Sequence, residues 1–113
     1  MKIDKNLQDK IQELQSAEQN LQNLLLQKQA FQIELNETES AIEEAEKSSG
    51  EIYKIIGQIM LKSKKEDILK ELKEKKDIIN LRIKAIEKQE QILQTKLENF
   101  KKELEEKFKE MKK

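Results

Sequence analysis

Apolar side chains in this chain fall into two long, regularly spaced segments. Within each segment, two rows of mostly apolar residues alternate at three- and four-residue steps. The mean spacing of about 3.5 residues keeps one stripe turned toward a partner helix in a left-handed supercoil. We call these rows the seam, and they predict two coiled-coil helices, over about 3–48 and about 64–111. The seam rows are Ile3, Lys10, Ala17, Leu24, Phe31, Thr38 and Ala45 with Leu7, Leu14, Leu21, Lys28, Leu35 and Ile42, then Leu69, Lys76, Ile83, Glu90, Leu97, Leu104 and Met111 with Leu72, Ile79, Ile86, Leu93, Phe100 and Lys107.

Local signals predict where the first helix ends and the second begins. Gly50, after Ser48-Ser49, suits a left-handed C-terminal cap, and Ser63-Lys64-Lys65-Glu66 is a capping-box pattern. Because the connection is short and the arms are similar in length, the helices should pair antiparallel, with residue i near residue 113 minus i. At ~1.5 Å per residue each arm would be roughly 65–70 Å long, with both chain ends at one tip.

Residues 51–62 form a short stretch between the arms that is rich in β-branched and other apolar residues. Gly57-Gln58 at its centre suits a two-residue type II′ turn, which has glycine at its first central position. We therefore predict a β-hairpin over about 51–62. The alternative is that the first helix continues through this stretch with its glycines as kinks, although glycine lowers helix stability.

Apolar side chains occupy consecutive positions in both halves of this hairpin, so both of its faces would be apolar. A lone two-stranded hairpin is marginally stable in water, and its edges carry unpaired backbone groups. We therefore expect the hairpins of several subunits to join into a larger sheet or a closed β-barrel body. The predicted subunit-assembly residues are Ile52, Tyr53, Ile55, Ile56, Gly57, Ile59, Met60 and Leu61.

Composition narrows the function classes. Charged residues make up 41% of the chain and hydrophobic residues 35%, which is too little for a thick globular core but fits long paired helices. Proline is absent, so nothing interrupts those helices. Histidine and cysteine are also absent, which removes disulfides, imidazole and thiolate chemistry and the usual zinc sites. With no phosphate-binding glycine loop either, we expect no catalytic, cofactor-binding or metal-binding residues, and no enzyme.

Charge and hydropathy also argue against nucleic-acid and membrane partners. The 23 basic and 23 acidic residues balance, so no global field favours a polyanion. No apolar run approaches the ~18–20 residues that span a bilayer. Residues 1–5 lead directly into a polar helix rather than a signal peptide. These features predict a soluble protein of the cytoplasm.

Four charged residues interrupt the seam, at Lys10, Lys28, Lys76 and Glu90. In one interpretation their aliphatic stems pack in the seam while the charged groups reach water. In the other, Lys28 and Glu90 approach each other and fix the register of the two helices. Both interpretations are compatible with the sequence.

A run of acidic residues precedes the hairpin. Carboxylates near a helix C-terminus oppose the helix macrodipole, so their position calls for a reason. They form either a solvated face or a contact surface for basic residues of an adjacent subunit, such as Lys62, Lys64 and Lys65. The acidic residues are Glu34, Glu37, Glu39, Glu43, Glu44 and Glu46.

Four short motifs occur in a specific order along the chain. They are Gln27-Lys28-Gln29, Asn36-Glu37-Thr38, Tyr53-Lys54 with Gly57 three residues on, and Ile86-Glu87-Lys88-Gln89-Glu90. Each motif is weak alone, but their order and spacing together are specific. With the layout of arm, hairpin and arm, they resemble prefoldin, and specifically the archaeal β-type subunit, over roughly residues 7–108. The α-type subunit of that family has two hairpins, whereas this chain has room for one.

The resemblance implies a hexamer of two α-type and four β-type subunits, whose hairpins form a double β-barrel body with six coiled-coil tentacles. It also implies that unfolded client proteins are held between the tips without ATP and passed to a group II chaperonin. The residues alone indicate only shared hairpins and a tip that carries both chain ends. The competing interpretation is a structural coiled-coil adaptor without chaperone activity, which leaves the apolar hairpin without a purpose.

The tip of the paired arms is the candidate client-binding site. Phe108 falls off the seam rows and would face outward beside Lys107, and flexible methionine suits promiscuous contacts. If the last turns separate, they offer an apolar surface ringed by charge. The alternative is that these residues, Leu7 and Leu104 above all, are ordinary seam residues that close the coil. The candidate client-binding residues are Ile3, Leu7, Ile11, Phe100, Leu104, Phe108 and Met111.

Overall fold

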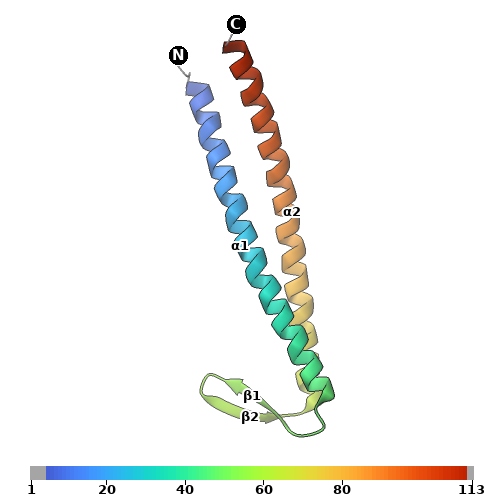
Figure 1. The fold of residues 1–113 in the computed structure, drawn as a ribbon. Coiled ribbons are helices and arrows are strands. Elements are labelled where there is room, and N and C mark those ends of the chain that lie inside the picture. The colour runs from blue at the N-terminus through green and yellow to red at the C-terminus, as the bar shows by residue number, and fades with distance from the viewer. Residues whose placement is uncertain (1–4, 112–113) are drawn as a thin grey trace. The chain divides into compact units, whose positions relative to one another are not determined.

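The computed structural model describes residues 5–111 and shows two long helices with one two-stranded antiparallel sheet between them (Figure 1). The predicted fold class, mainly α with a hairpin between two paired helices, is confirmed. The alternative of a first helix that continues through the hairpin region is wrong. The elements are helix α1 (Lys5–Lys47), strand β1 (Ile52–Ile56), strand β2 (Ile59–Ser63) and helix α2 (Lys65–Met111).

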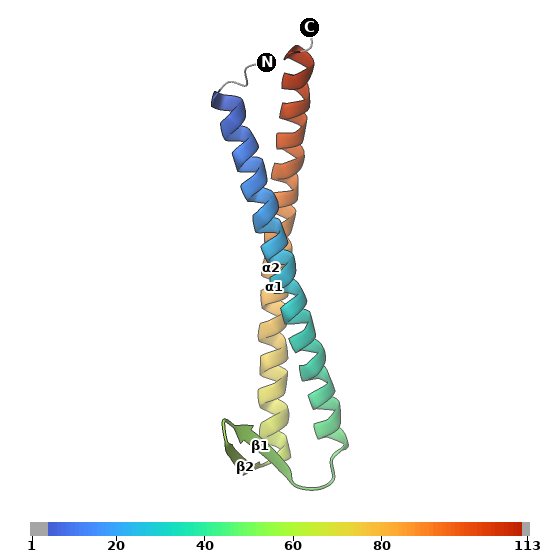
Figure 2. The ribbon, with the colours of Figure 1, turned by 60° about the vertical axis from the view of Figure 1, so that its left-hand side comes forward.

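The chain forms two compact units, and each helix contributes to both. The tip unit consists of residues up to Lys28 and from Ala85 onward, and the hairpin unit consists of Gln29–Lys84. In each unit a segment of α1 runs beside a segment of α2 in the opposite direction (Figure 1, Figure 2). Both units are therefore antiparallel helix pairs, and the hairpin unit carries the strands in addition.

Side-chain contacts between the helices show the register of each pair. In the tip unit, Lys10 Nζ lies 2.7 Å from Glu103 Oε2. In the hairpin unit, the Arg82 guanidinium lies 5.7 Å from the centre of the Phe31 ring, within the range of a cation–π contact. Both pairs follow the predicted rule that residue i lies near residue 113 minus i.

The seam forms the core of both units. Every seam position among residues 5–111 is buried or half-buried, as the heptad pattern predicted. The hydroxyl of Thr38 donates a 2.8 Å hydrogen bond to the backbone carbonyl of Glu34, so this polar residue enters the core without an unsatisfied group. The most buried residues are Leu7, Ala17, Ile86, Glu90, Leu97 and Leu104 in the tip unit, and Thr38, Ala45, Ile79 and Ile83 in the hairpin unit.

Lys28 and Glu90 meet in the seam of the tip unit. Lys28 Nζ lies 3.6 Å from Glu90 Oε1 and 3.9 Å from Glu87 Oε2. Glu90 is 9% exposed, and its Oε1 accepts no hydrogen bond. The two charges do approach each other as the second interpretation requires, but as an ion pair rather than a hydrogen bond. Whether this pair fixes the register stays a prediction.

Half of the acidic residues before the hairpin pair with lysines of α2 in the same chain, an outcome that neither interpretation of the sequence included. Glu34 pairs with Lys75 at 3.6 Å, Glu39 with Lys76 at 3.7 Å and Glu46 with Lys73 at 4.0 Å. The acidic surface of α1 therefore lies against the lysines on the neighbouring surface of α2. The antiparallel register brings the acidic end of α1 beside the basic beginning of α2, which the linear sequence does not display.

The C-terminal cap of α1 differs from the prediction. Gly50 does not adopt a left-handed conformation, since the one glycine with positive φ is Gly57. Instead the ammonium group of Lys65 donates hydrogen bonds to the carbonyl oxygens of Glu46, at 2.8 Å, and Ser48, at 3.1 Å. A lysine at a helix C-terminus donates hydrogen bonds to free carbonyl groups, and its positive charge interacts favourably with the negative end of the macrodipole. Lys65 therefore replaces the glycine cap.

The start of α2 also differs from the predicted capping box by one residue. Ser63 belongs to β2, and the first helical hydrogen bond runs from the Ile68 amide to the Lys64 carbonyl. Lys64 is therefore the N-cap residue, because the N-cap carbonyl accepts the first intrahelical bond. Glu66 and Asp67 lie in the first turn, where their negative charge complements the helix dipole.

Candidate functional site

The tip unit contains two buried leucines, one on each helix. Leu7 is 2% exposed and Leu104 is 8% exposed, so both pack in the seam. The 2.7 Å ion pair between Lys10 and Glu103 links the two helices beside them. Ile3, the first of the candidate tip residues, lies outside the described residues. Leu7 and Leu104 would become accessible only if the helix ends separated.

The other tip residues are accessible without such opening. Phe108 is 40% exposed, in agreement with its predicted outward position. Phe100 is half-buried, and Lys96 Nζ lies 5.6 Å from the centre of its ring, which is a cation–π distance. Ile11 and Met111 are half-buried. The tip unit thus presents apolar side chains next to charged groups.

The ion pair at the tip gives it a pH dependence. The hydrogen bond from Lys10 holds the pKa of the Glu103 carboxyl below its usual range, and the positive charge of Lys10 adds to the effect. A depressed folded-state pKa means that the pair stabilises the tip above the unfolded-state pKa, about 4.3 for glutamate. The stabilisation is lost as the pH falls through the folded-state pKa.

We expect an NMR titration of the Glu103 carboxyl to show a lowered midpoint that moves back toward the usual range in the variant Lys10→Met. The reason is that the substitution removes both the hydrogen bond and the charge that favour the ionised carboxyl. The wild-type chain titrated under identical conditions is the control. Equal midpoints in the two proteins would show that Lys10 does not bind Glu103 in solution.

The hairpin contains the predicted two-residue turn. Ile56 pairs with Ile59 across Gly57-Gln58. Gly57 has φ of +59°, and Gln58 has no positive φ, which is the pattern of a type II′ turn. A residue with a Cβ atom would be strained at position 57, although space is open there.

The two faces of the hairpin differ in how far they are covered. Tyr53, Ile55 and Met60 share one face and are 50%, 68% and 63% exposed. On the other face Ile52 is half-buried near the helices, whereas its more distant residues are open to solvent. The exposed residues of that second face are Ile56, Ile59 and Leu61, at 53%, 61% and 47%. Seven of the eight predicted assembly residues are therefore exposed in the isolated chain.

Ion pairs hold the base of the hairpin. Lys54 Nζ lies 2.7 Å from Glu71 Oε2 on α2, and Lys62 Nζ lies 2.7 Å from Glu51 Oε1. Glu51 also accepts a hydrogen bond from the Tyr53 hydroxyl. Lys62 and, to a smaller extent, Tyr53 lower the pKa of Glu51, and the Glu51 carboxylate in turn raises the pKa of Tyr53.

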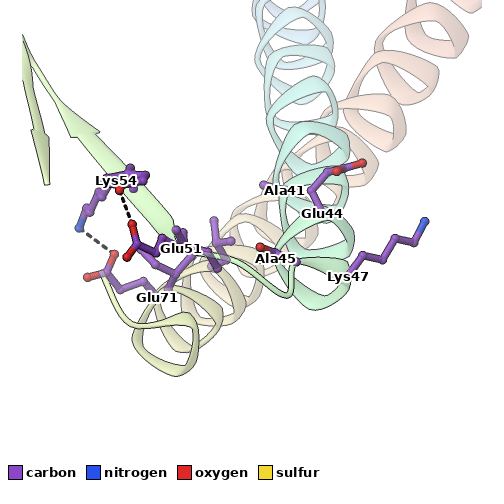
Figure 3. A pocket seen from close by; sticks show the side chains of 12 residues that line it. Ala41, Glu44, Ala45, Lys47, Glu51, Lys54 and Glu71 are labelled. Atoms are coloured by element: carbon purple, nitrogen blue, oxygen red, sulfur yellow. Dashed lines mark hydrogen bonds and ion pairs between the residues drawn. The ribbon is translucent and has the colours of Figure 1, made fainter. Parts of the chain in front are cut away.

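An open cleft of about 700 Å³, which we call the junction cleft, lies between the hairpin and the helix ends. Figure 3 shows Ala41, Glu44 and Ala45 on the α1 side of the cleft. On its other side, Lys54 of β1 forms an ion pair with Glu71 of α2. The sequence interpretation missed this cleft. Its local signal is the pair of small side chains one turn apart near the end of α1. The apolar lining consists of Ala41, Ala45, Ile52, Ile68 and Leu72.

Residues 5–111 contain no group of three or more histidine, cysteine, aspartate or glutamate side chains placed to hold a metal ion. Neither α1 nor α2 has a stretch that is long and apolar enough to cross a membrane. The surfaces that remain as functional candidates are the tip, the hairpin and the junction cleft.

Similarity to known proteins covers nearly the whole chain. The family model described as prefoldin subunit matches residues 8–111. Prefoldin subunit beta of Archaeoglobus fulgidus is 39% identical over 103 residues, covering 83% of this chain and 89% of that protein. Prefoldin subunit beta of Pyrococcus furiosus is 38% identical over 100 residues, covering 87% and 86%. The crystal structure of a prefoldin beta subunit from a Thermococcus strain matches with a TM-score of 0.86 at 33% identity, over 93% of this chain and 94% of that one.

These similarities agree with the fold. The beta subunit from Thermococcus resembles this chain along both helices and the hairpin between them. Prefoldin subunits are chaperone subunits that assemble into hetero-oligomers. The sequence match and the structural match cover the same elements, and this chain therefore belongs to the prefoldin family, where its similarity is to the beta subunits.

Proposed function

We propose that this chain is a β-type subunit of a cytoplasmic, ATP-independent holdase, which binds unfolded proteins at its tip and delivers them to a group II chaperonin. Four such chains would join two α-type subunits through their hairpins. Membership of the prefoldin family supports the chaperone role and the assembly. The observation that carries the client-binding role is the exposed Phe108, with the half-buried Phe100 and Met111 on the same helix.

The tip offers two layers of apolar surface to a client. Phe108 and Met111 are accessible in the closed helix pair, so they would make the first contacts. Leu7 and Leu104 form the buried layer beneath and would be added only if the last turns separate. A flexible methionine can adapt to many apolar sequences, as a chaperone for varied clients requires.

Truncating residues 1–8 and 104–113 is expected to abolish the suppression of client aggregation while leaving assembly intact. Within the described residues the truncation removes Lys5–Gln8 from α1 and Leu104–Met111 from α2, both in the tip unit, and it leaves the hairpin unit unchanged. Light scattering of a chemically denatured client, with the variant reconstituted together with an α-type partner, measures the activity. Full suppression of aggregation by the truncated complex would refute the assignment of client binding to the tip. If neither the intact nor the truncated complex suppresses aggregation, the chain is better explained as a structural adaptor.

A double substitution, Phe108→Ser with Met111→Ser, separates the accessible layer from the buried one. We propose that it weakens client binding by about tenfold, equivalent to ~1.4 kcal/mol, because each residue loses part of the apolar area that a client would cover. The matched control is Leu81→Gln with Ile92→Gln, which removes two side chains that are 66% and 68% exposed on α2. An equal loss in the control would mean that clients bind along the helices.

A further inference from the structure

An open groove between the two helices of the tip unit is lined by side-chain amides, and we call it the amide groove. It has a volume of about 350 Å³. Its amide side chains are exposed, whereas its two leucines are half-buried and form the floor. A second open cleft of about 470 Å³ shares Asn20 and Leu93 and continues along α1 to Asp9. The lining of the amide groove consists of Asn20, Asn23, Leu24 and Gln27 of α1 with Gln89 and Leu93 of α2.

The four amides of this groove are available to a ligand. The side chains of Asn20, Asn23, Gln27 and Gln89 make no hydrogen bond with another residue of the described range 5–111. Residues 19–27 include no charged side chain, although charged residues make up 41% of the whole chain. Each side-chain amide carries two N–H donors and one carbonyl acceptor. The groove is therefore suited to a neutral ligand that itself has alternating donors and acceptors.

The spacing of the amides fits an extended polypeptide main chain. Asn20, Asn23 and Gln27 recur at three- and four-residue steps on one face of α1, which places them roughly 4.5–6 Å apart along the helix axis. In an extended chain the N–H and C=O of every second residue point to the same side, with a repeat of ~6.6 Å. The flexible amide side chains can reach across this small difference. The ligand's own side chains would then lie alternately over the floor of Leu24 and Leu93 and in solvent.

We propose that the amide groove binds the main chain of an unfolded polypeptide in extended conformation, with Asn20, Asn23 and Gln27 hydrogen-bonded to its peptide groups. The inference rests on the proposed holdase function. Every polypeptide has the same main chain, so this groove recognises the unfolded state and not a particular sequence. The main chain of a folded protein is already paired in its secondary structure and does not compete. Each hydrogen bond adds little net free energy in water, so the groove supplements the apolar tip and does not replace it.

Two fluorescent peptides test this main-chain contact. The first is an unstructured peptide of serine, threonine and valine, and the second is its ester analogue, in which oxygen replaces each central peptide N–H. Fluorescence anisotropy with the full-length chain, reconstituted with an α-type partner, measures their binding. The peptide should bind about tenfold more tightly than the ester. The triple variant Asn20→Ala, Asn23→Ala and Gln27→Ala should bind both equally, at the affinity of the wild-type chain for the ester.

The matched control removes three other amides from α1 of the tip unit. Gln15→Ala, Gln19→Ala and Gln22→Ala together replace exposed residues that line neither the amide groove nor the cleft beside it. Alanine favours the helix in both triple variants, and circular dichroism checks that helix content is unchanged. The control should keep the wild-type preference for the peptide. Equal binding of peptide and ester by the wild-type chain, or equal losses in the two triple variants, would overturn the proposal.

A client-aggregation assay on the same complexes separates this inference from the proposed function. If the wild-type complex suppresses aggregation but does not distinguish peptide from ester, the holdase function stands and the main-chain contact is refuted. If it prefers the peptide but does not suppress aggregation, the main-chain contact stands and the holdase function is refuted. Peptide affinity that falls as the concentration of the chain rises would mean that a second copy occupies the groove, which would also overturn the proposal.

Discussion

Replacing Ile55 and Met60 together by threonine is expected to weaken subunit association by about 10–10³-fold per contact. The two residues lie directly opposite each other on β1 and β2 and are 68% and 63% exposed in the isolated chain. Full burial of such a side chain contributes roughly 1.5–3 kcal/mol; because about a third of each is already buried and threonine retains some apolar area, the pair would contribute about 1.5–4 kcal/mol. At ~1.4 kcal/mol per factor of ten, this range gives the expected loss.

Threonine keeps the hairpin itself intact, which makes this substitution more informative than a charged one. It is β-branched and common in strands, and a cross-strand pair of threonines is compatible with an antiparallel ladder. Two lysines at these opposite positions would repel each other and confuse loss of the hairpin with loss of association. The expected result therefore concerns apolar area at the interface and leaves the turn at Gly57 unchanged.

Native mass spectrometry over a concentration series, with and without an α-type partner, measures this effect. Leu81→Gln with Ile92→Gln again supplies the control, since it removes as many exposed apolar side chains from α2. Association should be normal in that variant. An unchanged complex in the threonine variant would show that this face of the hairpin stays open after assembly and that the predicted assembly residues are wrong in part.

The success of the fold prediction has a specific physical basis. A heptad pattern encodes both the helical state and the face that is buried, and the described seam positions show that burial. The turn was predictable for a similar reason, because Gly57 is needed where φ is positive. In both cases one short-range rule determines the structure at each position.

The details that the sequence did not predict depend on contacts between distant residues. Lys65 caps α1 from 19 residues beyond Glu46, a contact that the local glycine signal at Gly50 does not reveal. The junction cleft likewise depends on the direction in which the hairpin leaves the helix ends, which no periodicity encodes. Ala41 and Ala45 are visible in the sequence as small side chains, but small side chains at a seam can equally mark close helix packing.

The ion pair in the seam leads to the largest expected change in the stability of the helices. We expect Lys28→Leu to lower the free energy of unfolding by about 1–3 kcal/mol, because it leaves the carboxylate of Glu90 nearly buried without its cation. Glu90→Leu should cost little, since the side chain of Lys28 is 23% exposed and its ammonium group can turn toward water.

The double variant, Lys28→Leu with Glu90→Leu, is expected to be more stable than the wild-type chain by about 1–2 kcal/mol. Two leucines complete the apolar seam, and the cost of removing two charges from water disappears. Urea unfolding of all four proteins at one protein concentration gives the coupling energy, which should be at least about 1 kcal/mol. The matched control is Lys10 with Glu103, another pair across the two helices whose side chains are 34% and 48% exposed, for which the corresponding cycle should give ~0–1 kcal/mol. Additive effects of the two leucines would mean that Lys28 and Glu90 meet without influencing each other, and that apolar packing alone sets the register.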